Sequence, residues 1–363
     1  MERSVKLASQ EVVALGVSLL LVGILIKLPL ILGLDPKDDI FYLKNLAPIA
    51  LGGLSLYLMM SAKPVKHSHW LIPAAIFLLS AVYVNLLPSN PENKVVLLVC
   101  LHLPLLLWGV CGWVYMQFDT RSLGKRVEFL KYNGDLAILS ALILMAGGVL
   151  AGATISLFSL IQLHIEPFIA QYVVLWGLVS VAIVSTFIIR NFQINLNPIA
   201  RLIALLFSPL TLLTLVAFLI GMATEGNNPY QDRNFLLVFN LMLFGIMILI
   251  AFSVSESSSS LQQRFIIWIL FLLVLVAICI DLLALSAILY RVNAFGLSEN
   301  RCAVFGSNLL IAGNLIIILI RLYAALRRKA ELKQVENDIA RYLPVYLAWV
   351  AFVVFCFPLI FGI

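Results

Sequence analysis

Three ionisable residues interrupt long apolar runs of this 363-residue sequence, namely Lys27, His102 and Asp281. A charge inside membrane hydrocarbon costs several kcal/mol unless it is paired or hydrated, so such residues mark candidate functional sites. At about 1.5 Å per residue, each lies roughly 9 to 14 Å below the same end of its predicted helix. The amides of Gln171 and Asn240 fall at or just above this depth. The five residues together predict one polar layer that lines an outward-facing cavity.

Each of the three also has a purely structural interpretation. Lys27 can extend its ammonium to the lipid headgroups, His102 can be a hydrogen-bonded core histidine, and Asp281 can hold a neighbouring helix. Against this, Lys27 and Asp281 have opposite charges at similar depth, which favours a connection between them, directly or through water or His102. We therefore expect both to face the bundle interior.

Other familiar chemistry has no sequence signal. The chain contains no GxxxxGK[ST], GxGxxG, HExxH or GxSxG motif, so ATP-driven transport by this chain is not expected. Its five cysteines form no CxxC pair. The sequence therefore predicts no cofactor, no metal site and no disulfide framework.

Composition places these residues in a membrane protein. Hydrophobic residues make up 63% of the chain and charged residues 12%, and apolar runs recur from end to end. We predict an all-α, polytopic integral membrane bundle that forms a single transmembrane domain over residues 1–363. The net charge of +6 is spread over short segments between these runs, which favours membrane lipids over nucleic acid as the anionic partner.

About eleven spans of the length that a bilayer requires can be read from the apolar runs. They are predicted near residues 11–33, 46–61, 70–87, 95–118, 135–163, 168–189, 202–222, 235–252, 265–290, 302–320 and 342–362. Lys and Arg concentrate in cytoplasmic loops. With the N-terminus inside and the C-terminus outside, 17 of the 24 Lys and Arg residues lie in cytoplasmic segments and 6 in outside loops, and Lys27 lies within the first span.

Two further segments carry packing signals. Residues 321–341 form the longest cytoplasmic segment, and the apolar residues between its charges recur at roughly helical spacing. It is predicted to be helical from Leu322 to Ile339, as a membrane-surface anchor or a docking surface for a protein partner. In the fifth span, Gly148 and Gly152 match GxxxG, which favours tight packing within the bundle over dimerisation.

The loop before the tenth span carries a family resemblance. It reads Arg291-Val-Asn-Ala-Phe295-Gly296-Leu297-Ser298-Glu299-Asn300-Arg301 and resembles the Tyr-Gly-Leu-Thr-Glu-Asn-Arg signature of the bacterial membrane family called domain of unknown function 4153. The resemblance extends over about residues 190–322, with Phe295 in place of Tyr and Ser298 in place of Thr. It implies a multi-pass protein of the bacterial cytoplasmic (inner) membrane and supplies no activity.

The same loop also has a plain physical interpretation. Gly296 permits a tight turn, Ser298 can cap the next helix, and Glu299 suits its first turn. Arg301 is then predicted to pair with Glu299 or with a lipid headgroup. The alternative is that this loop forms a functional rim of the predicted cavity.

Three functional classes remain open from the sequence. We expect first a transporter- or flippase-like protein that contacts a small or amphiphilic solute. A non-catalytic membrane assembly or sensory partner is the alternative. A lipid-linked glycosyl- or acyltransferase is the third, with Asp35, Asp38 and Asp39 in the first outside loop as its candidate acids. The substrate, the coupling ion and the oligomeric state have no signal in the sequence.

Overall fold

The computed structural model describes residues 2–31, 39–62, 67–90, 93–159, 163–192, 197–225, 233–254, 260–327 and 332–362. Helix accounts for 91% of the structure, and the described residues include no strand, which confirms the all-α prediction. Within them, eight helices are long and apolar enough to cross a membrane. Three shorter apolar helices, Gln10–Ile26, Leu206–Ile220 and Met242–Ala251, coincide with the remaining predicted spans.

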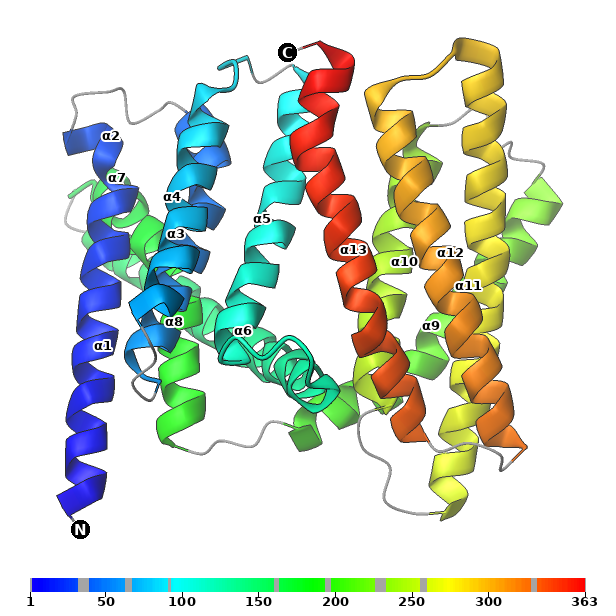
Figure 1. The fold of residues 1–363 in the computed structure, drawn as a ribbon, viewed down its shortest axis with the longest axis horizontal. Helices are drawn as coiled ribbons and strands as arrows, with labels where there is room; N and C mark the ends of the chain where they lie inside the picture. The colour runs from blue at the N-terminus through cyan, green and yellow to red at the C-terminus, as the bar shows by residue number, and fades with distance from the viewer. Residues whose placement is uncertain are drawn as a thin grey trace. The chain divides into compact units, whose positions relative to one another are not determined.

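The helices group into two compact units. The first unit covers Met1–Arg121, Tyr132–Leu196 and Gly362–Ile363. Its elements are α1 (Glu2–Ile26), α2 (Leu28–Ile31), α3 (Asp39–Met60), α4 (His67–Leu86), α5 (Lys94–Tyr115), most of α6 (Leu123–Ser159), α7 (Glu166–Phe168), the π-helix η1 (Ile169–Val174) and α8 (Leu175–Asn191). Helix α3 packs against α1, α4, α5 and α8, as Figure 1 shows in blue to green. Val22, Tyr57 and Ile183 lie in the core of this unit.

The second unit covers Ser122–Lys131 and Asn197–Phe361. It contains α9 (Asn197–Glu225), α10 (Arg233–Val254), α11 (Ser260–Phe295), α12 (Glu299–Leu326) and α13 (Leu332–Phe361). Helix α11 packs against α9, α10 and α12, and α13 packs against α10 and α12 (Figure 1). Leu270, Ala277 and Leu315 are fully buried in its core. That the two units form one transmembrane domain, as the sequence predicts, stays a prediction.

The first predicted span is broken at Lys27. Helix α1 ends at Ile26, and the short α2 begins at Leu28. The Lys27 amide donates to the Ile24 carbonyl (3.1 Å), three residues back, which is a tighter turn than an α-helix makes. Pro29 has no amide hydrogen, and its ring disfavours a straight helix through the preceding turn. The sequence therefore bends the chain at Lys27, the residue whose charge interrupts the first apolar run.

The segment predicted to be cytoplasmic contains parts of two helices. Helix α12 ends at Leu326, Arg327 lies in a turn, and α13 begins at Leu332. Leu322 and Val335 are fully buried in the core of the second unit. The described residues between Leu322 and Ile339 are thus helical, as predicted, except for the turn at Arg327, and apolar residues of this segment pack in the core of the second unit.

The described residues show no close packing at Gly148 and Gly152. A Cβ built at either position meets no atom within 4 Å. Val149 and Leu150, between them, are 70% and 69% exposed. The tight packing within the bundle that GxxxG predicts is therefore not found among the described residues.

Candidate functional site

An apolar groove of ≈ 730 Å³ lies between α1 and the continuous α7–η1–α8 stretch of the first unit. One wall is a single helical face of α1, and the other is rich in aromatic rings. The lining residues are Leu19, Leu20, Gly23, Ile24, Lys27, Phe168, Tyr172, Val173, Trp176, Gly177, Ser180 and Val184. Lys27 is the charged residue of this lining.

Lys27 has only neutral partners in this groove. Its ammonium donates to the backbone carbonyl of Gln171 and lies 3.9 Å from the centre of the Tyr172 ring. Two residues of the predicted polar layer, Lys27 and Gln171, are thus in contact. An ammonium has three donors, and no carboxylate of the described residues acts on this one. The site therefore presents a positive charge that the described part of the chain does not neutralise.

The π-helix η1 shapes the wall opposite Lys27. A π-helix inserts an extra residue into a helical turn, and such turns occur frequently at functional sites. Here η1 carries both Gln171 and Tyr172, the two residues that contact the ammonium. Ser180 lines the same groove further along, and its buried hydroxyl has no hydrogen-bond partner among the described residues.

Gly23 allows the two walls to approach closely. A Cβ at this position would lie 2.9 Å from the indole nitrogen of Trp176, too close for an unstrained contact. The same nitrogen donates to the carbonyl of Leu19 (3.2 Å). Glycine on α1 therefore lets the indole N–H of Trp176 reach the backbone of the helix, and the ring forms part of the groove.

A second polar site lies in the core of the second unit. Asp281 on α11 is 0% exposed, and neither carboxylate oxygen has a hydrogen-bond partner among the described residues. Asn314 on α12 is also fully buried and donates to the Tyr346 hydroxyl on α13 (3.1 Å). Asn314 Oδ1 has no partner among the described residues, and the Tyr346 phenol is within electrostatic range of Asp281. The packed helices α11 and α12 thus both contribute buried oxygen atoms without a described partner.

The remaining residues of the predicted layer are His102 and Asn240. His102 on α5 is held locally through Nδ1 by the Leu98 carbonyl (2.8 Å). Asn240 on α10 has a buried Oδ1 without a partner. Lys27 belongs to the first unit and Asp281 to the second, so their connection stays a prediction.

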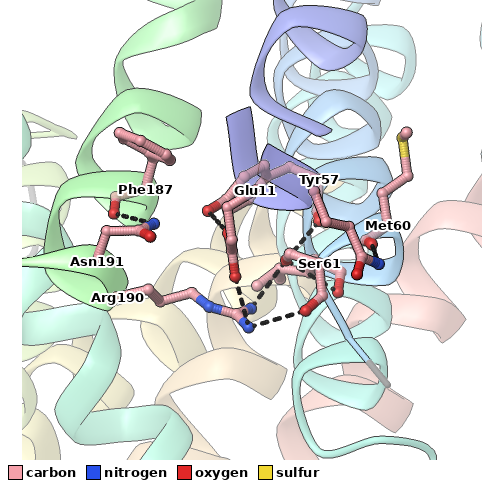
Figure 2. Close-up of polar contacts among 9 residues, drawn as sticks. Glu11, Tyr57, Met60, Ser61, Phe187, Arg190 and Asn191 are labelled. Carbon is pink, nitrogen blue, oxygen red and sulfur yellow. Dashed lines mark hydrogen bonds and ion pairs between the residues drawn. The ribbon is translucent and has the colours of Figure 1, made fainter. Parts of the chain in front are cut away.

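A buried ion-pair cluster in the first unit had no sequence signal. Figure 2 shows Glu11 of α1 receiving the Tyr57 hydroxyl of α3 and facing Arg190 of α8, with 3.3 Å between the charged atoms. Arg190 also donates to Ser61 Oγ (3.0 Å) and to the Ser61 carbonyl (3.2 Å). A cation at the last carbonyls of α3 also suits the helix dipole. Glu11, Tyr57 and Arg190 are all satisfied here, so the cluster joins three helices.

The family-like loop forms a self-contained cap. Gly296 has a φ of 74°, and Ser298 Oγ accepts from the Arg301 amide (3.4 Å) at the start of α12. This agrees with the turn and capping interpretation. The Arg301 guanidinium donates to the carbonyls of Phe295 (3.1 Å) and Gly296 (2.7 Å), partners that the sequence did not indicate.

Removing the cap should have a modest effect on stability. We expect Ser298→Ala to lower the free energy of unfolding by about 1 kcal/mol, because one amide of the first turn loses its acceptor. Ser298→Thr should keep most of the stability. Unfolding in mixed detergent micelles measures both, and an unchanged Ser298→Ala variant would show that the cap contributes nothing.

Comparison with protein-family models, curated proteins and solved structures finds no match to this chain. The resemblance of residues 190–322 to domain of unknown function 4153 therefore stays a prediction. The acids considered for a transferase also gain no support, since Asp35 and Asp38 lie outside the described residues and Asp39 begins α3. The function has to be argued from the geometry of the described sites.

Proposed function

We propose that this chain is a transporter- or flippase-like, multi-spanning protein of the bacterial inner membrane that binds an amphiphile with an anionic headgroup. The observation that carries this proposal is Lys27, an ammonium that has no carboxylate partner among the described residues and lies in an otherwise apolar groove. A charge in such surroundings is costly unless a ligand or water neutralises it. An anionic headgroup at Lys27 supplies the missing charge.

The rest of the groove suits a hydrocarbon chain. Its lining runs from Phe168 to Val184, about 24 Å along the helix at 1.5 Å per residue. One leaflet of membrane hydrocarbon is roughly 15 Å thick. Leu20, Ile24 and Phe168 are largely exposed at its edges, which gives a lipid tail access from the side. These dimensions favour an amphiphile over a small hydrophilic solute.

The proposal includes eleven spans, with the N-terminus inside and the C-terminus outside. It is supported by eight long apolar helices and three shorter ones at the predicted positions, together with the charge distribution of the loops. In this orientation, Lys27 lies in the outer half of the membrane. The headgroup would then enter from the outer leaflet.

Thiol labelling tests the orientation. In a cysteine-free background, Ser298→Cys should react with an impermeant maleimide applied to intact cells, whereas Gln334→Cys should react only after the membrane is opened. The expected difference is near complete, since the bilayer excludes the reagent. Labelling of Gln334→Cys alone in intact cells would reverse the topology.

Filling the groove tests the function. A Cβ at Gly177 meets no atom within 4 Å, so Gly177→Phe can place a ring in the groove without displacing the backbone. Lipids extracted from the purified variant should lack an anionic amphiphile that mass spectrometry finds with the wild type. Gly147→Phe is the matched control, because Gly147 is also exposed and open but lies on α6, outside the groove.

The opposite results have distinct meanings. Equal retention of the anionic amphiphile by Gly177→Phe and the wild type would show that the groove is not its binding site. If the wild type retains no amphiphile but a stoichiometric protein subunit, the assembly-partner alternative replaces this proposal.

A further inference from the structure

Asp281 is a buried carboxyl group for which the described residues of the second unit supply no countercharge. Its side chain is 0% exposed, and both carboxylate oxygens lack hydrogen-bond partners among the described residues. Around it, α11 presents the fully buried apolar residues Ala277, Ile280 and Ala284. An ionised carboxylate in such surroundings is strongly unfavourable unless a cation neutralises it.

The buried polar groups on α12 and α13 offer oxygen rather than positive charge. Asn314 lies on α12, which packs against α11, and its Nδ2 donates to the Tyr346 phenol oxygen at 3.1 Å; this phenol is within electrostatic range of Asp281. Asn314 Oδ1 is buried and has no partner. The donors left in this group are the Tyr346 proton and the second Nδ2 hydrogen of Asn314, against three acceptors on Asp281 and Asn314 that have no partner among the described residues.

Among the described residues, no charged side chain has a resolved electrostatic effect on Asp281, and Tyr346 is a titratable group within its electrostatic range. Helices α9, α10 and α12 pack around α11 in this unit, as Figure 1 shows. The described residues of α10 and α12 contribute the uncharged amides Asn240, Asn308 and Asn314 to this core.

We propose that Asp281, Asn314 and Tyr346 form a binding site for one small monovalent cation, a proton or an alkali ion, in the core of the second unit. The cation supplies the positive charge that Asp281 lacks, and the surplus oxygens supply its ligands or hydrogen-bond acceptors. Hard cations prefer such oxygen ligands. The site goes beyond the proposed amphiphile groove and does not rest on it, since none of its residues lines that groove.

Infrared spectroscopy of the full chain in lipid nanodiscs tests the proton. With a bound proton, the difference spectrum of wild type minus Asp281→Asn at neutral pH contains the carbonyl stretch of a protonated carboxylic acid. Stability should then fall as pH rises in the wild type, because the folded state holds a proton that the unfolded state releases. In the pH range where the unfolded state has released this proton and the folded state still holds it, the unfolding equilibrium constant rises about tenfold per pH unit. Asp281→Asn abolishes this rise.

Thermal unfolding in sodium chloride tests the alkali ion. With a bound sodium ion, the carboxylic acid band is absent, and the Tm of the wild type rises with sodium chloride but not with choline chloride. Asp281→Asn removes this rise. Tyr346→Phe should weaken the apparent affinity roughly five- to tenfold through loss of one oxygen ligand. Tyr342→Phe, one turn earlier on α13, is the matched control and should leave the affinity unchanged.

Two results would overturn the site. One is a wild type with neither the acid band nor a sodium-dependent Tm, because Asp281 would then be ionised and neutralised in another way. The other is an acid band that appears only in Lys27→Gln, which would make Lys27 the partner of Asp281, as the sequence alone predicted. An independent result for the amphiphile groove is obtained from Gly177→Phe, so the two proposals can fail separately.

Discussion

A Lys27→Gln variant is expected to bind phosphatidylglycerol at least about tenfold more weakly than the wild type does. Hydrogen bonds to charged groups contribute roughly 1.5 to 3 kcal/mol, and about 1.4 kcal/mol corresponds to a factor of ten in affinity. Gln keeps a polar side chain, one atom shorter than that of Lys, and removes the charge. Binding to phosphatidylcholine with the same acyl chains should change little. Titration followed by native mass spectrometry measures both affinities.

Two further lysine variants make this result specific. Lys27→Arg keeps the charge and should retain most of the affinity, with some loss because the guanidinium is larger and planar. Lys94→Gln removes a lysine at the start of α5, outside the groove, and should bind like the wild type. If Lys94→Gln weakened binding as much as Lys27→Gln, the effect would be a general loss of positive charge.

The second large effect concerns stability. We expect Glu11→Ala to lower the free energy of unfolding by roughly 3 kcal/mol, since it leaves Arg190 without its anion and the buried Tyr57 hydroxyl without its acceptor. The partial exposure of Arg190, 35% of its side chain, limits the loss to the lower end of the range for broken buried pairs. Tyr57→Phe removes one hydrogen bond and should cost about 1 kcal/mol.

A matched ion pair gives the control. Glu166 is 46% exposed and faces His164 at 3.9 Å, so Glu166→Ala should change the unfolding free energy by less than about 0.5 kcal/mol. Unfolding in mixed micelles measures all three variants. A Glu11→Ala change as small as that of Glu166→Ala would mean that the cluster does not hold α1, α3 and α8 together.

Lys27 illustrates what the sequence could predict about the site. A charge within an apolar run is visible without a structure, and so is Pro29, which accounts for the break beside it. The wall opposite Lys27 was not visible, because a π-helix has no known sequence rule as simple as a cap or a turn. The contact between Gly23 and Trp176 depends on how two distant helices pack.

Glu11 and Arg190 show a different limit. Both lie at the ends of predicted spans, where charged residues are ordinary and carry no burial signal. Only the packing of α1 and α3 against α8 makes them a buried pair. The turn at Arg327 was missed for a similar reason, since no Gly or Pro interrupts the helical spacing from Leu322 to Ile339. The apolar residues of α12 and α13 recur at helical spacing on both sides of this turn, so the sequence predicts a single helix.

The most direct test of the amphiphile groove is the distance between Lys27 Nζ and the phosphorus of a bound lipid. Solid-state NMR can measure this nitrogen–phosphorus dipolar coupling with ¹⁵Nζ-labelled lysine and phosphatidylglycerol, and Lys27→Arg identifies which lysine signal belongs to Lys27. A headgroup held by the ammonium places the two nuclei within about 4 Å, so the Lys27 signal should be dephased strongly by phosphorus. A Lys27 signal that phosphorus does not dephase, in a sample saturated with phosphatidylglycerol, would contradict the proposed binding site.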